Sequence, residues 1–413
     1  MHSLYIAVAA LGAAHFLFSK RDFDYFALAF LSALLYFLPG LFGVTSYSVD
    51  GRWSDTQIHP EAYAIMIFVL SSIYLAERAS AHAPSLPAFT TRVPAPGSVA
   101  VILAVAACTG LAGLLLDAGS EVFQTDKANV LESLGRWHIL FYSAGTLGFA
   151  VAYAAKRHVL LLLFLALLAF DLYIGFRSAL SIALLSVFVL MFHARGKKRL
   201  AATNWAMTTM VLAFGFLMFG YAHIAFAAKA ETWDVVWSTL TNPEAILFFF
   251  TRSEPFIIQQ TLNEVISRRF ETDMDHVLSS VYQLMLFAPE LGADTVSFNS
   301  KFQPALFPEV AYGLASNIWA QMWSAGGWPL LVAFAAVFNI VLAVGNATLR
   351  ARCTVLRAGL APVFCYWAFY IHRNDLGYTL NLAKRHLLLL LFAVVLVWIL
   401  KAATRRTELS QQP

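Results

Sequence analysis

The sequence predicts an all-α integral membrane protein that crosses the bilayer many times, and two observations support this fold class. Of its 413 residues, 60% are hydrophobic and only 13% are charged. The apolar residues form repeated runs that approach or reach the ~20 residues a helix needs to cross the hydrocarbon core. Because a bilayer admits only structures that satisfy their own backbone hydrogen bonds, we expect residues 1–413 to form a single polytopic helical membrane domain.

We expect about eleven spans, placed by the apolar runs and the turn residues between them. They are residues 3–18, 25–43, 60–78, 98–117, 138–155, 158–174, 178–194, 203–226, 328–347, 355–371 and 383–400. The first run has no Lys or Arg ahead of it and no small-residue cleavage site after it. We therefore interpret it as a retained helix rather than a signal peptide.

The distribution of basic residues indicates the orientation, because short cytoplasmic loops are enriched in Lys and Arg. More than half of the 28 basic residues fall in one alternate set of short loops, which includes Lys198 and the segment after span eleven that begins at Lys401. The sequence thus predicts a cytoplasmic C-terminus and an outward N-terminus. The longest segment between spans, residues 228–327, is then expected on the outer side, between spans eight and nine.

This long insert is where we expect the function to lie, because it holds two patterns in which a capping residue precedes a helix. In the clearer one, Ser253 precedes Pro255, and apolar residues recur at a nearly helical spacing as far as Phe270. Polar residues occupy the other side, so the pattern predicts an amphipathic helix lying on the membrane surface. Its N-terminus, beside Arg252, is suited to bind an anion such as phosphate.

Two more arginines are predicted near the outer boundary, Arg177 between spans six and seven and Arg373 between spans ten and eleven. A structural interpretation pairs Arg177 with Asp171 and Arg373 with Asp375. The functional alternative is that Arg177, Arg252 and Arg373 together bind an anionic group, since a guanidinium stays charged and can bind phosphate with two parallel hydrogen bonds.

Arg268 and Arg269, at the far end of the amphipathic helix, are weaker candidates for the same anion. Arg268 stands four residues after Glu264, a spacing that also favours an ordinary ion pair on one helix face. The sequence shows no cluster with metal-ligand spacing, and its net charge of +4 is dispersed. We therefore expect no metal or other cofactor and no nucleic-acid partner.

Two stretches of the sequence have a distinctive pattern. The first is GFRSALSIALLSVFVLMFHARGKKRL, in which a G-x-R-S turn opens a hydrophobic helix that ends in a basic loop. The second is YGLASNIWAQMWSAGGWPLLVAFAAVF, a small-residue and aromatic approach to a glycine-rich turn that starts the next span. Both stretches resemble the bacterial oligosaccharide repeat-unit polymerases (Wzy-type O-antigen or exopolysaccharide polymerases). The resemblance covers about residues 171–400, and it implies a GT-C-like architecture in the bacterial inner membrane with its active site facing the periplasm.

The resemblance also implies the chemistry. The donor is a glycan on undecaprenyl pyrophosphate, the acceptor is one lipid-linked repeat unit, and a chain-length regulator is a further partner beside membrane lipid. Cationic side chains stabilise the leaving pyrophosphate without a metal. We assign this role to Arg177, Arg252 and Arg373, with Arg268 and Arg269 behind them. A general base must also deprotonate the acceptor hydroxyl, and the candidates in order are Glu254, then His372, Asp375 and Glu309.

Three alternatives remain. An O-antigen ligase shares the architecture but resembles a group with an H-[N/S/Q] motif in the large loop, whereas His276 is followed here by Val277. A lipid-phosphate-sugar glycosyltransferase would use acidic residues of the first outer loop, such as Asp50 and Asp55. A transporter would be expected to show matched half-chains and charges within its spans, and the sequence has no internal repeat. The sequence therefore favours the polymerase.

Overall fold

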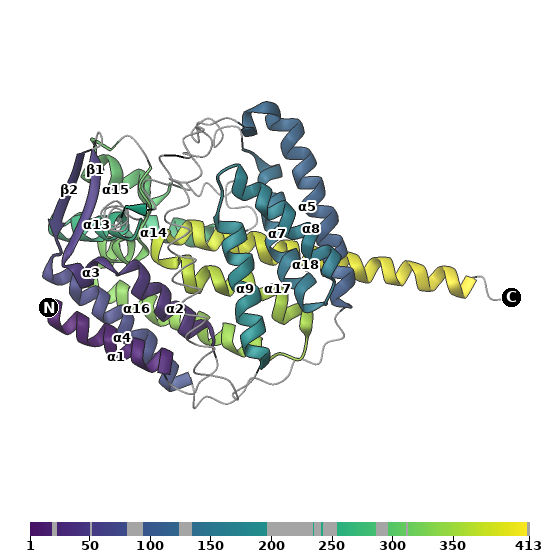
Figure 1. The fold of residues 1–413 in the computed structure, drawn as a ribbon, viewed down its shortest axis with the longest axis horizontal. Coiled ribbons are helices and arrows are strands. Elements are labelled where there is room, and N and C mark those ends of the chain that lie inside the picture. Colours follow the sequence, from purple (N-terminus) through teal and green to yellow (C-terminus); the bar gives the residue numbers. More distant parts are fainter. Residues whose placement is uncertain are drawn as a thin grey trace. The chain divides into compact units, whose positions relative to one another are not determined.

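The computed structural model describes residues 1–18, 23–49, 52–80, 94–123, 134–195, 234, 241–242, 254–285, 296–310 and 313–410. They are mainly helical (Figure 1). The elements in chain order are α1 (His2–Phe18), α2 (Tyr25–Tyr36), α3 (Pro39–Phe42), β1 (Val44–Val49), β2 (Arg52–Gln57), α4 (Pro60–Ser80), α5 (Pro96–Ala118), the 3₁₀ helix η1 (Gly119–Phe123), α7 (Arg136–Ala154), α8 (His158–Tyr173), α9 (Ser178–Arg195), α13 (Glu254–Ser267), α14 (Met274–Tyr282), α15 (Phe298–Leu306), α16 (Ile318–Leu349), α17 (Thr354–Phe369), the 3₁₀ helix η3 (Tyr370–Arg373) and α18 (Leu376–Ser410).

The chain has the helices of a membrane protein. Within the described residues, five helical stretches are long and apolar enough to cross a bilayer, namely Pro60–Ser80, Pro96–Phe123, Ile318–Leu349, Thr354–Arg373 and Leu376–Thr404. Four shorter apolar helices, α1, α2, α8 and α9, accompany them. Each predicted span coincides with helix except residues 203–226, which lie outside the described part of the chain. The number of membrane crossings stays a prediction.

The chain divides into two compact units. The first holds residues 1–84, 195–346 and 366–382, and the second holds residues 85–194, 347–365 and 383–413. In the first unit α1 and α2 both pack against α4, and in the second α5 packs against α7 and α7 against α8. A glycine permits the close approach of α5 to α7, because a Cβ atom at Gly110 would lie only 2.6 Å from the backbone nitrogen of Phe141.

The start of α2 shows how polar residues fix a helix in the first unit. Asp24 is its N-cap, and the Asp24 carboxylate accepts a hydrogen bond from the backbone N–H of Ala27 at 3.0 Å. Asn346, near the end of α16, donates to the same carboxylate at 3.0 Å and accepts from the N–H of Tyr25 at 2.9 Å. A cap on one helix is therefore completed by a side chain 322 residues later.

A two-stranded hairpin departs from the all-α prediction. β1 and β2 pair antiparallel, with Val44 opposite Gln57 and Thr45 opposite Thr56. The segment is polar and rich in Ser and Thr, so hydropathy assigned it to a loop. The signal was the dipeptide Asp50–Gly51 between two segments containing β-branched and aromatic residues, a combination typical of short hairpin turns.

The helix after the insert begins earlier than predicted. Span nine was expected at 328–347, but α16 starts at Ile318 and is interrupted at Gly326 and Gly327. Gly327 has φ 57° and ψ −149°, a conformation that only glycine adopts readily. The interruption coincides with the glycine-rich turn that the sequence indicated before the span. A short helix thus precedes the apolar one.

Candidate functional site

The helix predicted in the insert is present as α13, but its expected position on the membrane surface is wrong. The apolar side chains of Phe256, Ile258 and Leu262 are fully buried, and so are Gln260 and Asn263 on the polar side. An amphipathic pattern predicts that two faces meet different surroundings; it does not say that the polar face meets water. In α13 that face packs against the β1–β2 hairpin.

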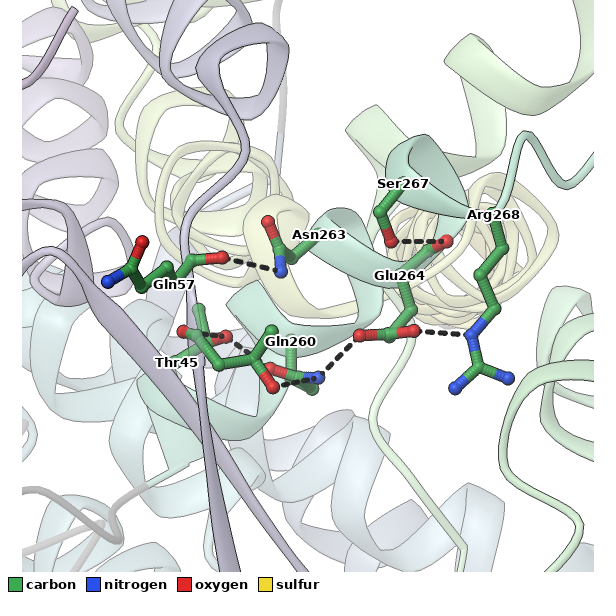
Figure 2. A network of polar contacts seen from close by, with 8 residues as sticks. Thr45, Gln57, Gln260, Asn263, Glu264, Ser267 and Arg268 are labelled. Carbon is green, nitrogen blue, oxygen red and sulfur yellow. Dashed lines mark hydrogen bonds and ion pairs between the residues drawn. The ribbon is translucent and has the colours of Figure 1, made fainter.

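Hydrogen bonds join the polar face of α13 to the hairpin (Figure 2). The Gln260 side chain contacts the Thr45 hydroxyl and donates to the Thr56 hydroxyl at 3.3 Å. Asn263 donates to the Gln57 carbonyl at 3.2 Å and accepts from the backbone N–H of His59 at 2.7 Å. Since buried amides are costly without partners, these contacts explain how the polar face of α13 is tolerated in the interior.

The far end of α13 carries the two arginines predicted there. Arg268 Nε donates to the Glu264 carboxylate at 2.6 Å, so the expected ion pair is confirmed, and the Arg268 side chain is 50% exposed. Gln260 donates to the other oxygen of Glu264 at 2.9 Å, which links this pair to the hairpin network (Figure 2). Arg269 has φ 51° and ends the helix, with Phe270 N–H donating to the Val265 carbonyl at 2.9 Å.

The near end of α13 holds the contact on which the candidate site is built. Both oxygens of the Glu254 carboxylate accept from Arg373, at 2.6 Å from Nη2 and 3.1 Å from Nη1. The Glu254 and Arg373 side chains are 15% and 23% exposed, so the pair is only partly accessible. It joins the first residue of α13 to η3, 119 residues along the chain. Arg373 is thus paired with Glu254, not with Asp375 as the structural interpretation of the sequence expected.

Aromatic side chains surround this pair. The Arg373 guanidinium carbon lies 5.5 Å from the centre of the Tyr370 ring, and the phenol groups of Tyr36 and Tyr378 are close enough to interact with its charge. Arg373 Nε is buried and donates to no side chain or backbone group among the described residues. Tyr378 is 48% exposed. The site therefore combines one carboxylate, one guanidinium with an unused donor, and hydroxyl groups.

Asp375, a candidate base, caps a helix. One carboxylate oxygen accepts from the N–H of Tyr378 at 2.7 Å, in the first turn of α18. The other accepts from the N–H of Phe298 at 3.1 Å, at the start of α15. The side chain is buried, and its charge faces the N-termini of two helices, where a carboxylate is stabilised. Asp375 thus holds α15 and α18 together beside the Glu254–Arg373 pair.

His372, the other candidate base next to Arg373, is fully buried. Its Nδ1 accepts a hydrogen bond from the indole N–H of Trp319 at 3.0 Å. The rings of Phe37 and Phe338 stand against it edge-on, and the Tyr36 ring is 6.0 Å away. These contacts place the imidazole in an aromatic core. Glu309, the last candidate base, is exposed after the end of α15.

Two further predicted arginines, Arg177 and Arg252, lie outside the described part of the first unit. Arg252 lies outside the described residues. Arg177 belongs to the second unit, where its carbonyl accepts from the Ser181 hydroxyl at 2.6 Å. Asp171, the expected partner of Arg177, is buried and lies 2.8 Å from His138 Nε2. The candidate site is therefore described around Glu254 and Arg373 alone.

A second polar group beside the site was missed by the sequence analysis. Gln321, buried in α16, accepts from the N–H of Leu376 at 2.8 Å and lies 3.2 Å from His276 Nε2. Burial and the charge of Lys301 lower the pKa of His276. Asn317 caps α16 and donates to the Ile258 carbonyl at 3.3 Å. The available signal was Asn317 and Gln321, two amides four residues apart in an otherwise apolar and aromatic stretch.

Within the described residues, no three His, Cys, Asp or Glu side chains are grouped so that they could hold a metal ion. Comparison of the chain with family models, with curated proteins and with solved structures finds no match.

Proposed function

We propose that the chain is a polysaccharide polymerase of the bacterial inner membrane, which joins undecaprenyl-pyrophosphate-linked repeat units at the periplasmic face. The observation that carries the proposal is the Glu254–Arg373 pair. It unites a group able to accept a proton with a group able to bind pyrophosphate, where the insert meets the turn between α17 and α18. The resemblance of residues 175–200 and 312–338 to the repeat-unit polymerases supports the same assignment.

In this proposal the donor pyrophosphate binds Arg373 and takes over hydrogen bonds that Glu254 now accepts. Arg373 suits this exchange because its Nε donor has no acceptor among the described residues, and a guanidinium can turn two parallel donors toward a phosphate. Arg177 and Arg252 are proposed as further contacts to the pyrophosphate. Arg268 is a weaker contact because Glu264 already holds it, and Arg269 lies beside it.

The released Glu254 carboxylate then acts as general base. The acceptor hydroxyl oxygen bonds to the anomeric carbon of the donor, and its proton passes to Glu254. The bond from that carbon to the pyrophosphate oxygen breaks, and undecaprenyl pyrophosphate leaves with the electron pair, stabilised by arginine. Asp375 and His372 serve better as positioning residues, since Asp375 binds two backbone N–H groups and His372 is closed in by aromatic rings.

The deciding experiment is the glycan made by cells that lack this chain. A polymerase mutant should carry lipid capped with a single repeat unit, and the plasmid-borne gene should restore long chains. Uncapped lipid together with accumulated lipid-linked polymer would instead identify an O-antigen ligase and overturn the proposal. An unchanged glycan would exclude both activities.

A further inference from the structure

The second unit contains a connected cluster of polar side chains among its apolar helices. On α7, His138, Tyr142 and Thr146 recur every four residues and therefore lie on one face of the helix. His138 Nε2 lies 2.8 Å from the carboxylate of Asp171 on α8. Toward the next turn of α7, the Tyr142 hydroxyl accepts a hydrogen bond from Arg385 Nη1 on α18 at 3.4 Å. The cluster therefore joins α7, α8 and α18, and the proposed reaction uses none of its members.

Arg385 carries a positive charge that no carboxylate of the described residues pairs with. None of the ion pairs found among these residues includes Arg385, and Asp171, the buried carboxylate of the cluster, faces His138 instead. Lys384 adds a second positive charge directly before Arg385. A cation near the hydrocarbon is costly without a partner, so an anion from outside the chain would stabilise the cluster.

Arg385 and Tyr142 offer hydrogen-bond donors in an arrangement suited to a phosphate. The Tyr142 hydroxyl accepts from Arg385 through a lone pair, so its own proton can be donated to a further acceptor. The Arg385 guanidinium has further N–H groups, which can bind two phosphate oxygens in parallel. Both side chains are half-buried, and a hydrogen bond that is partly shielded from water is stronger than an exposed one. The two side chains can thus bind one phosphate between α7 and α18.

The cluster lies where a lipid phosphate is expected. His138 and Arg385 stand at the starts of the predicted spans five and eleven, and Asp171 stands near the end of span six. The distribution of Lys and Arg predicts all three of these ends at the outer boundary of the bilayer. Headgroup phosphates lie at that level, just outside the hydrocarbon.

The face of α18 that follows Arg385 can contact acyl chains. Leu388, Phe392 and Val395 come three, seven and ten residues after Arg385, which places them on the same face of the helix. Their side chains are 40%, 56% and 40% exposed. The most apolar part of α18 is only 17% buried, whereas the corresponding parts of the other stretches able to cross a bilayer are at least 39% buried. An apolar surface thus leads from Arg385 into the predicted hydrocarbon.

We propose that Arg385 and Tyr142 bind the phosphate of an anionic phospholipid whose acyl chains lie along this face of α18. A negative headgroup is favoured because the ammonium group of a zwitterionic headgroup would approach the positive charges of Lys384 and Arg385. His138 acts as a positioning residue, since the centre of its ring lies 5.2 Å from that of Tyr142 and 4.8 Å from that of Phe176. This lipid belongs to the bilayer, and its binding does not depend on the polymerase activity.

The test uses the full-length protein, freed of lipid in a neutral detergent, and native mass spectrometry to follow the binding of phosphatidylglycerol. Arg385→Met removes the charge and keeps a long side chain, whereas Tyr142→Phe removes the hydroxyl group and keeps the ring. Arg350→Met is the matched control, because Arg350 is exposed after the end of α16 in the same unit. Elution of each variant at the wild-type volume checks its folding.

The wild-type protein and Arg350→Met should bind one phosphatidylglycerol more tightly than phosphatidylcholine. Arg385→Met should weaken that binding by about tenfold or more, as expected for a lost hydrogen bond to a charged group, and Tyr142→Phe by about threefold. If Arg385→Met aggregates, the result for Tyr142→Phe decides, and unchanged binding by that variant contradicts the site.

Three further results would overturn the proposal. Equal affinity of the wild-type protein and Arg385→Met for phosphatidylglycerol would show that Arg385 holds no lipid phosphate. Equal affinity of the wild-type protein for phosphatidylcholine would show that the charge of the headgroup is not recognised. Displacement of phosphatidylglycerol by an equal concentration of undecaprenyl phosphate would assign the site to a polyprenyl substrate and not to a lipid of the bilayer.

Discussion

Arg373 is held by two hydrogen bonds that only a guanidinium can make in parallel, and its replacement separates charge from geometry. Lys at this position keeps the positive charge but lacks the two parallel N–H donors of a guanidinium. If Arg373 binds pyrophosphate, Arg373→Lys should lower polymerisation by roughly 10²–10³-fold, as expected for a lost donor to a developing oxyanion. Glycan chain length in complemented cells measures this loss of polymerisation. The amount of the variant protein in the membrane serves as the reference.

Arg350→Lys is the matched control, since Arg350 is exposed directly after the end of α16, belongs to no candidate contact and should tolerate Lys with nearly normal chains. The double variant Glu254→Gln, Arg373→Met distinguishes the two roles of the pair. A purely structural pair should regain function when both charges are removed, because no unpaired charge remains. Normal chains from the double variant would therefore refute catalysis by this pair.

Lys156 has φ 56° and ends α7 in the left-handed region, where the Cβ atom of an L-residue is strained. The N–H of Arg157 donates to the Ala152 carbonyl at 3.0 Å, a C-terminal motif that favours glycine. Lys156→Gly should stabilise the protein by about 1 kcal/mol. Thermal unfolding in detergent measures the gain, and Lys156→Ala, which keeps the strain, should show none.

At the scale of elements, the contact of α13 with the β1–β2 hairpin depends on Gln260. Gln260→Ala removes a donor to Glu264 and to Thr56 and leaves the buried Thr45 hydroxyl without its partner on α13. We expect a loss of about 1–3 kcal/mol, the cost of buried polar groups left without partners. Thermal unfolding, compared with Ser267→Ala on the exposed end of the same helix, provides the measurement. Equal melting temperatures for the two variants would show that the contact of α13 with the hairpin does not depend on Gln260.

α14 should make the first unit sensitive to acid, because burial and Lys301 lower the pKa of His276 from its ordinary 6.5. The unfolded chain then binds a proton that the folded chain resists, so stability falls as the pH drops below about 6.5. Asp273, and Asp375 at the start of α18, act in the opposite direction. His276→Gln should flatten the decrease in melting temperature between pH 7 and pH 5. An unchanged decrease in melting temperature would show that other titratable groups cause the sensitivity to acid.

At the scale of the whole molecule, the orientation can be tested with reporters fused to the chain. The distribution of Lys and Arg predicts that a reporter near Gly292 reads as extracytoplasmic, whereas reporters near Lys198 and after Lys401 read as cytoplasmic. Alkaline phosphatase and green fluorescent protein fusions give opposite signals for the two sides. A cytoplasmic Gly292 would remove the proposed mechanism, since its substrates are presented at the outer face.

The sequence predicted the helices well because hydropathy depends on runs of neighbouring residues, and α4, α5 and α8 coincide closely with the expected spans. It missed the hairpin because Ser and Thr in β1 carry no hydropathy signal. It predicted that α13 is amphipathic but not what covers its polar face. The partner of Arg373 was also missed, because Glu254 is 119 residues away and Asp375 only two.

The contact between Thr45 and Gln260 joins segments 215 residues apart, and this distance has a consequence for biosynthesis. A ribosome delivers the hairpin long before it delivers α13, at ~5–20 residues per second. During that interval of roughly 10–40 seconds, the threonines of the hairpin lack their final partner on α13. The nascent chain must therefore keep this polar segment hydrated or attended by a chaperone until α13 arrives. A stop codon between the two segments would leave a membrane-inserted fragment with an uncovered hairpin, a form that quality-control proteases are suited to remove.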